Sequence, residues 1–181
     1  MRTALIAGIG NVLLGDDGVG PYVLRLLESR YNFDDDLELS DLGTPALDLT
    51  HQIVGLRALI LIDSVQSDAD PGTIFLYRKE DILQTAPAER LDPHSPALSE
   101  CLMTAEMLGA SPEQVVLVGI VGENFEPGRP LSASVAASVE KAIALILHEV
   151  EGLGYCVRQK LRPDTPGIWW GESPSPSLHP R

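Results

Sequence analysis

Residues 3–20 read TALIAGIGNVLLGDDGVG, and this stretch decides the fold. The run Thr3–Ala7 is continuously apolar and ends at Gly8, as is typical of a strand covered on both faces of a parallel sheet. A glycine-bearing turn follows, and from Val19 the apolar residues recur at helical spacing to about Arg30. The order of strand, tight turn and helix indicates the first half of a β-α-β unit and predicts an α/β fold.

The turn does not have the composition of a phosphate-binding loop. A dinucleotide fingerprint needs a third glycine where Leu13 stands, and a P-loop needs a lysine near Asp16 and Asp17. Two adjacent carboxylates repel phosphate, although they interact favourably with the dipole of the following helix. One of the two aspartates is enough to cap that helix, so the other is a candidate metal ligand or acid–base group.

The rest of the chain continues the alternation of strands and helices. Further strands are predicted at 37–42, 58–62, 73–77 and 115–121, and further helices at about 46–54, from 95 onwards and from 132 to 152. This order predicts a mostly parallel sheet with helices on both faces and one antiparallel strand after Asp63.

Two polar segments are predicted to lack regular structure. Residues 78–93 are expected to form a long loop, and loops of that length inside a domain are often functional. Residues 162–181 are rich in Pro and Ser. We place one folded domain at 1–155 and a Pro/Ser-rich tail at 156–181.

Composition and charge restrict the partners. The 181 residues carry a formal net charge of −13, which disfavours DNA, RNA and anionic membrane surfaces. Cys101 and Cys156 show no CxxC spacing, so we expect no disulfide framework and a reducing compartment. No stretch approaches the roughly 20 apolar residues of a membrane-spanning helix. We therefore expect a cytoplasmic protein that binds neither nucleic acid nor membrane.

Several candidate site residues follow strands at the edge where open α/β sheets bind ligands. Asp63 ends the strand ALILI, Asp41 ends LELSD, and His94 closes the 78–93 loop. Asp17, Asp63 and His94 together offer two carboxylates and one imidazole with open positions, which suits Ni²⁺, Zn²⁺ or a similar divalent ion. Without a metal the same three side chains can act as acid, base and orienting group. The structural alternatives are a turn residue or a hydrogen-bond acceptor for a neighbouring loop amide for Asp63, and a solvent-exposed helix start for His94.

Nucleophiles are poorly represented. The sequence has no G-x-S-x-G elbow. Cys101 lies on the apolar face of its predicted helix, where a small hydrophobic role is favoured. Ser64 follows Asp63 but has no evident base beside it. Asp41 is a further carboxylate at the same edge that can orient or activate a water.

Five segments together resemble the nickel–iron (NiFe) hydrogenase maturation endopeptidases. In chain order they are GIGNVLLGDDGVG (8–20), DLGT (41–44), ALILID (58–63), DPH (92–94) and VVLVGIVGENFEPG (115–128). The resemblance extends from residue 1 to about 150 and implies a three-layer α/β/α sandwich. It also implies an endopeptidase that removes a short C-terminal peptide from the hydrogenase large-subunit precursor after nickel insertion.

The resemblance also implies roles for individual residues. An acidic residue, an aspartate and a histidine are metal ligands in that family, and they match Asp17, Asp63 and His94 here. Nickel would then arrive with the precursor, and other divalent metals are candidates in vitro. Asp41 and Asp16 would support the site. Two departures, Pro45-Ala46 after the DLGT segment and a glycine absent from HSPALSE (94–100), bear on the choice of precursor.

Two other functions remain open at this point. A nickel-sensing chaperone would bind the precursor without cutting it. A hydrolase or phosphorylase for a small metabolite would need a basic or phosphate-binding group at the sheet edge, and we find none in the sequence. We expect a monomeric, aspartic-type, metal-assisted endopeptidase.

Overall fold

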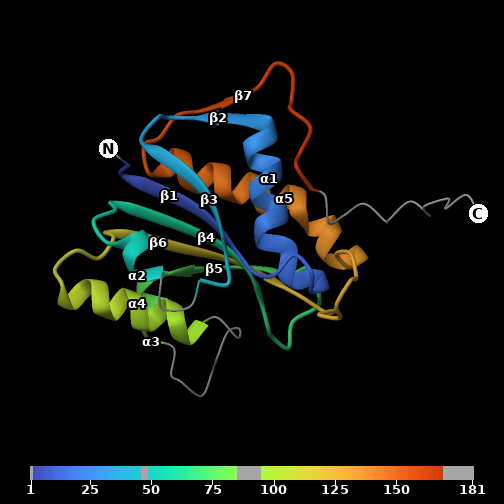
Figure 1. Cartoon of the computed structure of the whole chain (residues 1–181), viewed down its shortest axis with the longest axis horizontal. Helices are drawn as coiled ribbons and strands as arrows, with labels where there is room; N and C mark the ends of the chain where they lie inside the picture. Colours follow the sequence, from blue (N-terminus) through green and yellow to red (C-terminus); the bar gives the residue numbers. More distant parts are fainter. Residues whose placement is uncertain (1, 46–48, 85–94, 169–181) are drawn as a thin grey trace, which may run out of the picture.

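A five-stranded sheet in the order β3-β1-β4-β6-β5 forms the middle layer of the computed structural model, which describes residues 2–45, 49–84 and 95–168 (Figure 1). The strands are β1 (Ala4–Ile9), β3 (Leu37–Gly43), β4 (Ala58–Val65), β5 (Ile74–Arg78) and β6 (Gln114–Val121). The pairs between β3, β1, β4 and β6 are parallel, and β5 is antiparallel to β6. The prediction of a mostly parallel sheet with one antiparallel strand after Asp63 is confirmed.

Helices cover both faces of this sheet. One face carries α1 (Val19–Arg30) and α5 (Ala133–Gly152), and the other carries α2 (Leu49–Ile53), α3 (Lys79–Gln84) and α4 (Ser95–Met107). The α/β/α sandwich implied by the resemblance is therefore confirmed. None of the helices in the described part of the chain combines the length and apolar character needed to span a membrane.

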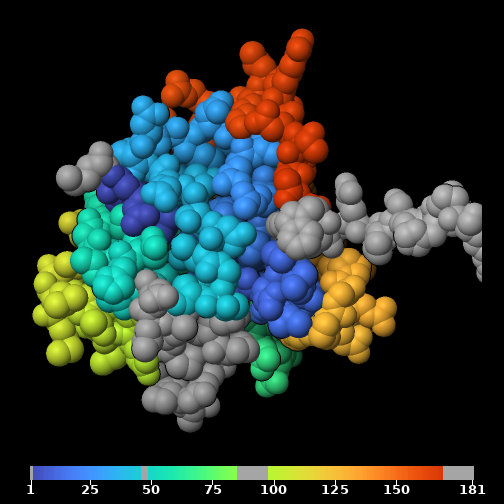
Figure 2. All heavy atoms as spheres, in the orientation of Figure 1, coloured from blue at the N-terminus to red at the C-terminus, as the bar shows by residue number. Residues whose placement is uncertain are grey.

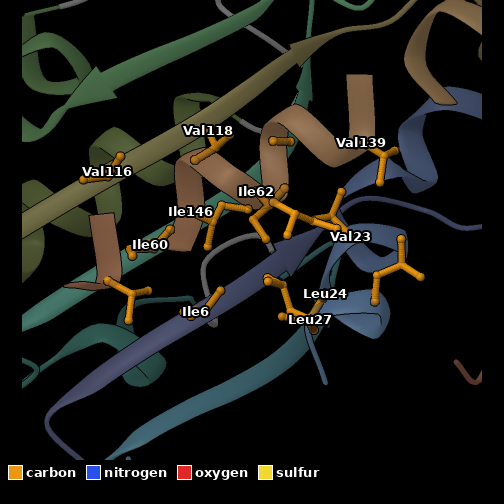
Figure 3. Packing of buried hydrophobic residues seen from close by; sticks show 14 of the residues in the cluster. Ile6, Val23, Leu24, Leu27, Ile60, Ile62, Val116, Val118, Val139 and Ile146 are labelled. Atoms are coloured by element: carbon orange, nitrogen blue, oxygen red, sulfur yellow. The ribbon is translucent and has the colours of Figure 1, made fainter. Parts of the chain in front are cut away.

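Two hydrophobic clusters separate the layers. On β4, Ile60 and Ile62 pack toward α1 and α5, whereas Leu59 and Leu61 pack toward α2, α3 and α4. Figure 3 shows the first cluster, where side chains of the sheet face those of the two covering helices. Burial of each such side chain contributes roughly 1.5–3 kcal/mol, which explains why the strand sequences are continuously apolar rather than alternating.

The segment after β5 differs from its prediction. We expected a loop over residues 78–93, but Lys79–Gln84 form α3. The Asp81 carboxylate accepts the Arg78 N–H at 2.8 Å, and Ile82 is buried against the sheet. This local cap and the packing of Ile82 and Leu83 support a short helix in a polar sequence. Residues 85–93 lie outside the described residues.

Other differences are at element ends. A separate two-stranded antiparallel sheet pairs β2 (Tyr31–Phe33) with β7 (Val157–Gln159) and was not predicted. β7 lies beyond residue 155, where we placed the start of the tail. Residues 162–168 have no regular structure, as predicted. Leu108, which we assigned to the apolar face of α4, lies past the helix end and is exposed.

Candidate active site

The site lies where the winding of the sheet reverses. The chain leaves β1 to form β3 on one side and then returns to form β4 on the other side. The loops that follow β1 and β4 therefore diverge, and such switch points are where open α/β sheets bind ligands. Asp17 lies in the turn after β1, and Asp63 lies on β4, which continues beyond Ile62 to Val65.

Glycines let the opening turn, defined as residues 10–18, lie close to the strand ends. Gly10 has φ +128°, and a Cβ there would lie 1.8 Å from the carbonyl oxygen of Asp17. A Cβ on Gly20 would lie 2.3 Å from the carbonyl oxygens of both Ile9 and Ile62. The start of α1 thus packs directly on the backbone of β1 and β4, which brings Asp17 next to β4.

The Asp17 carboxylate is buried and held by two donors. Its Oδ2 accepts the Asn11 N–H at 2.8 Å, and its Oδ1 accepts the Ser64 hydroxyl at 3.1 Å. The side chain is only 5% exposed. Since each carboxylate oxygen can accept more than one bond, Asp17 retains capacity for a ligand.

Asp63 is also buried and shares a partner with Asp17. Its Oδ1 accepts the backbone N–H of Ser64 at 2.8 Å. Side chains alternate between the two faces of the sheet along β4. Asp63 is therefore on the same face as Leu59 and Leu61, and Ser64 is on the same face as Ile60 and Ile62. Ser64 therefore faces the layer of α1, from which Asp17 projects. Asp17 and Asp63 thus each accept a hydrogen bond from Ser64, Asp17 from its hydroxyl group and Asp63 from its backbone N–H.

His94, the third predicted ligand, lies outside the described residues, and α4 begins directly after it at Ser95. Within residues 2–45, 49–84 and 95–168, no three His, Cys, Asp or Glu side chains form a group that could hold a metal ion. The metal site composed of Asp17, Asp63 and His94 stays a prediction.

Asp16 does not cap a helix. It is fully buried, and its Oδ2 accepts the N–H groups of Glu123 and Asn124 at 2.9 and 3.0 Å, while Oδ1 accepts the Ser132 N–H at 2.7 Å. Neither the 3₁₀ helix η1 (Gly15–Gly18) nor α1 has a side-chain cap. The prediction that Asp16 or Asp17 is an N-cap is wrong, because Asp16 binds amides of the loop after β6 and Asp17 binds Asn11 and Ser64.

These bonds attach the loop after β6 to the opening turn. The Asp16 N–H donates to the Asn124 carbonyl, and the Gly128 N–H donates to the Leu13 carbonyl, each at 2.8 Å. Figure 2 shows the opening turn, in blue, beside this loop, in gold. We call residues 122–132 the 122–132 loop. Its exposed residues Glu123 and Glu126 help to line an open hollow of about 690 Å³ beside the turn.

Asp41 lies at the same edge of the sheet, one strand away. It pairs in register with Gly8, and its carboxylate accepts the Gly43 N–H at 3.0 Å and lies 3.8 Å from the Arg25 guanidinium. In the described part of the chain, the partners of the Asp41 carboxylate are therefore Gly43 and Arg25 rather than Asp17 or Asp63.

A family model described as hydrogenase maturation protease (HycI) matches residues 21–149. The chain belongs to the hydrogenase maturation protease family. It is 32% identical to the hydrogenase 2 maturation protease of Escherichia coli K12 over 147 residues, which covers 79% of this chain and 87% of that protein. It is 34% identical over 159 residues to a putative hydrogenase maturation protease of Methanocaldococcus jannaschii, covering 83% and 97%.

A solved maturation protease has the same fold. The hydrogenase maturating endopeptidase HybD from E. coli superposes with a TM-score of 0.80 at 29% identity, covering 88% of this chain and 98% of that chain. The resemblance found in the sequence motifs is confirmed, and the protein is a peptidase.

Two contributions to the site of this maturation protease were missed. We set Ser64 aside because it lacked a base, but its hydroxyl is bonded to Asp17. Asn11, which we treated as part of a turn, donates its N–H to the same carboxylate. Two features of the sequence could have indicated Ser64: it follows Asp63 directly, and it is on the face of β4 that also carries Ile60 and Ile62.

Cys101 is buried, as predicted for a small hydrophobic residue.

Proposed function

We propose that this maturation protease removes the C-terminal peptide of a nickel-loaded NiFe-hydrogenase large-subunit precursor. Family membership supports the peptidase activity and the hydrogenase substrate. The observation that carries the proposal is that two buried carboxylates, Asp17 and Asp63, each accept a hydrogen bond from Ser64 at the switch point of the sheet. Burying a carboxylate is costly unless hydrogen bonds or a cation compensate its charge, so two buried carboxylates at this edge suit a cationic ligand.

The donor set suits a nickel ion presented by the substrate. Carboxylate oxygens and an imidazole are ligands that borderline divalent ions accept, and the bonds to Asn11 and Ser64 leave lone pairs available on Asp17. Asp17, Asp63 and His94 would hold the nickel that the precursor carries, and other divalent ions can take its place in vitro. A bound cation would supply charge stabilisation to the scissile carbonyl or to the attacking water.

The chain's own groups would then complete an aspartic-type, metal-assisted hydrolysis. Asp41 at the neighbouring strand end orients or activates the water, and Asp16 maintains the wall of the site through the 122–132 loop. The partner is the precursor polypeptide, and the protease acts as a cytoplasmic monomer.

The test is mass spectrometry of the precursor after incubation with the purified protease. We expect a C-terminal mass loss with nickel-loaded precursor, none with nickel-free precursor, and a loss of activity of at least about 100-fold in Asp17→Asn, since essential groups commonly contribute this much. The control is Asp35→Asn, an exposed carboxylate before the amino end of β3 at the opposite edge of the sheet, which should cleave normally. A tight complex without mass loss would instead support the chaperone function.

A further inference from the structure

Ser64 donates a hydrogen bond to each of the two buried carboxylates. Its hydroxyl donates to Asp17 Oδ1 at 3.1 Å, and its backbone N–H donates to Asp63 Oδ1 at 2.8 Å. Ser64 itself is 1% exposed. Both bonds therefore lie away from bulk water, where hydrogen bonds to ionised groups are strong.

The backbone of Ser64 is held by its pairing with β6. β4 is an interior strand of the sheet, paired with β1 up to the Gly8–Ile62 register pair and with β6 through Ser64–Ile120. A donor on this strand has little freedom to move. The hydroxyl of Ser64 thus hydrogen-bonds Asp17 of the opening turn to the same strand that carries Asp63.

The two bonds respond differently to substitution. The N–H bond to Asp63 remains whichever side chain replaces Ser64, except proline. The hydroxyl bond to Asp17 is lost in alanine, which leaves Asp17 with the Asn11 N–H on its other oxygen. Because the terminal torsion of an aspartate has a broad energy minimum, a carboxylate held at one oxygen can rotate.

A nucleophilic role does not fit the geometry of Ser64. The side chain is buried, and the proton of its hydroxyl is already donated to Asp17. The remaining role is structural support for the neighbouring carboxylate.

We propose that Ser64 is a positioning residue that holds the Asp17 carboxylate in a fixed orientation relative to Asp63, so that both can meet the metal carried by the precursor. This inference rests on the proposed function. Residues that orient metal-binding side chains typically change metal affinity or activity by about 10- to 100-fold when they are removed.

The experiment compares Ser64→Ala with Ser138→Ala. Ser138 is a second buried serine, 8% exposed, whose hydroxyl donates to the Val135 carbonyl within α5 at 2.7 Å. For each folded variant, kcat and KM are measured with nickel-loaded precursor, and Ni²⁺ binding to the free protease is measured by calorimetry. We expect Ser64→Ala to lower kcat and Ni²⁺ affinity by about 10-fold or more with KM for the precursor unchanged. Ser138→Ala should change neither quantity.

A pair of isosteric variants separates the hydroxyl from the packing. Ser64→Thr and Ser64→Val have the same shape and the same steric cost, and they differ in the hydroxyl. We expect the Thr variant to exceed the Val variant by about 10-fold in kcat and Ni²⁺ affinity. Equal values in this pair overturn the inference, including in the case where Ser64→Ala does not fold.

The two proposals can fail separately. If the wild-type protein cleaves no precursor but its Ni²⁺ affinity falls in Ser64→Val relative to Ser64→Thr, the proposed function fails and the positioning role stands. If the wild-type protein cleaves the precursor, and Ser64→Thr and Ser64→Val have equal kcat and Ni²⁺ affinity, the positioning role fails and the proposed function stands. If the free protease binds no Ni²⁺, the difference in kcat between Ser64→Thr and Ser64→Val decides whether Ser64 has the positioning role.

Discussion

At the scale of single residues, Asp16 and Asp17 are neighbours whose carboxylates serve different parts of the molecule. Asp17 contacts the opening turn and β4, whereas Asp16 contacts three amides of the 122–132 loop. The sequence predicted the pair as one helix cap and one ligand. The role of Asp16 could not be predicted, because its partners are 107 to 116 residues away along the chain. Local patterns carry no information on such contacts.

The buried position of Asp16 predicts a large effect of Asp16→Asn. An asparagine has one acceptor oxygen, so its amide group would face at least one backbone N–H that needs an acceptor. Leaving a buried donor unsatisfied and losing a charged acceptor should lower the free energy of unfolding by about 2–4 kcal/mol. Urea unfolding measures this change, and hydrogen exchange should show loss of protection at the amides of Glu123, Asn124 and Ser132.

The control for Asp16→Asn is Asp34→Asn. The Asp34 carboxylate accepts the N–H of the exposed residue Cys156 at 2.8 Å. Because water can replace that bond, we expect a loss below about 1 kcal/mol. Equal losses in the two variants would show that the Asp16 bonds to the 122–132 loop contribute no more than a surface contact.

At the scale of elements, the strands of the central sheet were predicted well, whereas β2, β7 and α3 were not. β1, β4 and β6 are continuous apolar strands because both of their faces are buried. β2 and β7 have three residues each and form through their mutual pairing, which no local pattern encodes. The strands that carry Asp41 and Asp63 were therefore predicted, whereas the donors from Asn11 and the 122–132 loop to Asp17 and Asp16 were not.

The close packing of α1 on the strands predicts a severe effect of Gly20→Ala. A Cβ at Gly20 would lie 2.3 Å from backbone carbonyl oxygens of Ile9 and Ile62, and neither strand can move away without losing its ladder. We expect a loss of roughly 3 kcal/mol or more in the free energy of unfolding, at the upper end of overpacking effects. Thermal unfolding measures it.

Gly152→Ala is the matched control for this helix glycine. Gly152 ends α5, and a Cβ there would meet nothing within 4 Å. Alanine is the better helix former, so stability should rise by up to about 1 kcal/mol. A fully stable Gly20→Ala variant would show that α1 is not held against the carbonyl groups of β1 and β4.

At the scale of the whole molecule, the candidate site and the small β2–β7 sheet lie in different regions. The carboxyl ends of the strands carry Asp17 and Asp63, whereas the small β2–β7 sheet follows the C-terminal end of α1. Figure 1 shows this small sheet away from the opening turn. α1 has 12 residues and is about 18 Å long, which separates the two regions. The mostly parallel sheet with one antiparallel strand was predicted from the alternation of strands and helices, whereas the strand order and the pairing of β7 with β2 were not.

The separation of these regions predicts that stability and activity can be changed independently. Val157 of β7 pairs with Phe33 and packs against the cluster under α1 and α5, whereas its neighbour Arg158 is exposed. Val157→Ser should lower the free energy of unfolding by about 1–2 kcal/mol, since a partly buried apolar side chain is lost, and Arg158→Ser should have a smaller effect. Both variants should keep the wild-type kcat for precursor cleavage at temperatures well below their unfolding transitions. A folded Val157→Ser variant with reduced kcat would contradict this separation, because it would mean that the β2–β7 sheet influences the site through α1.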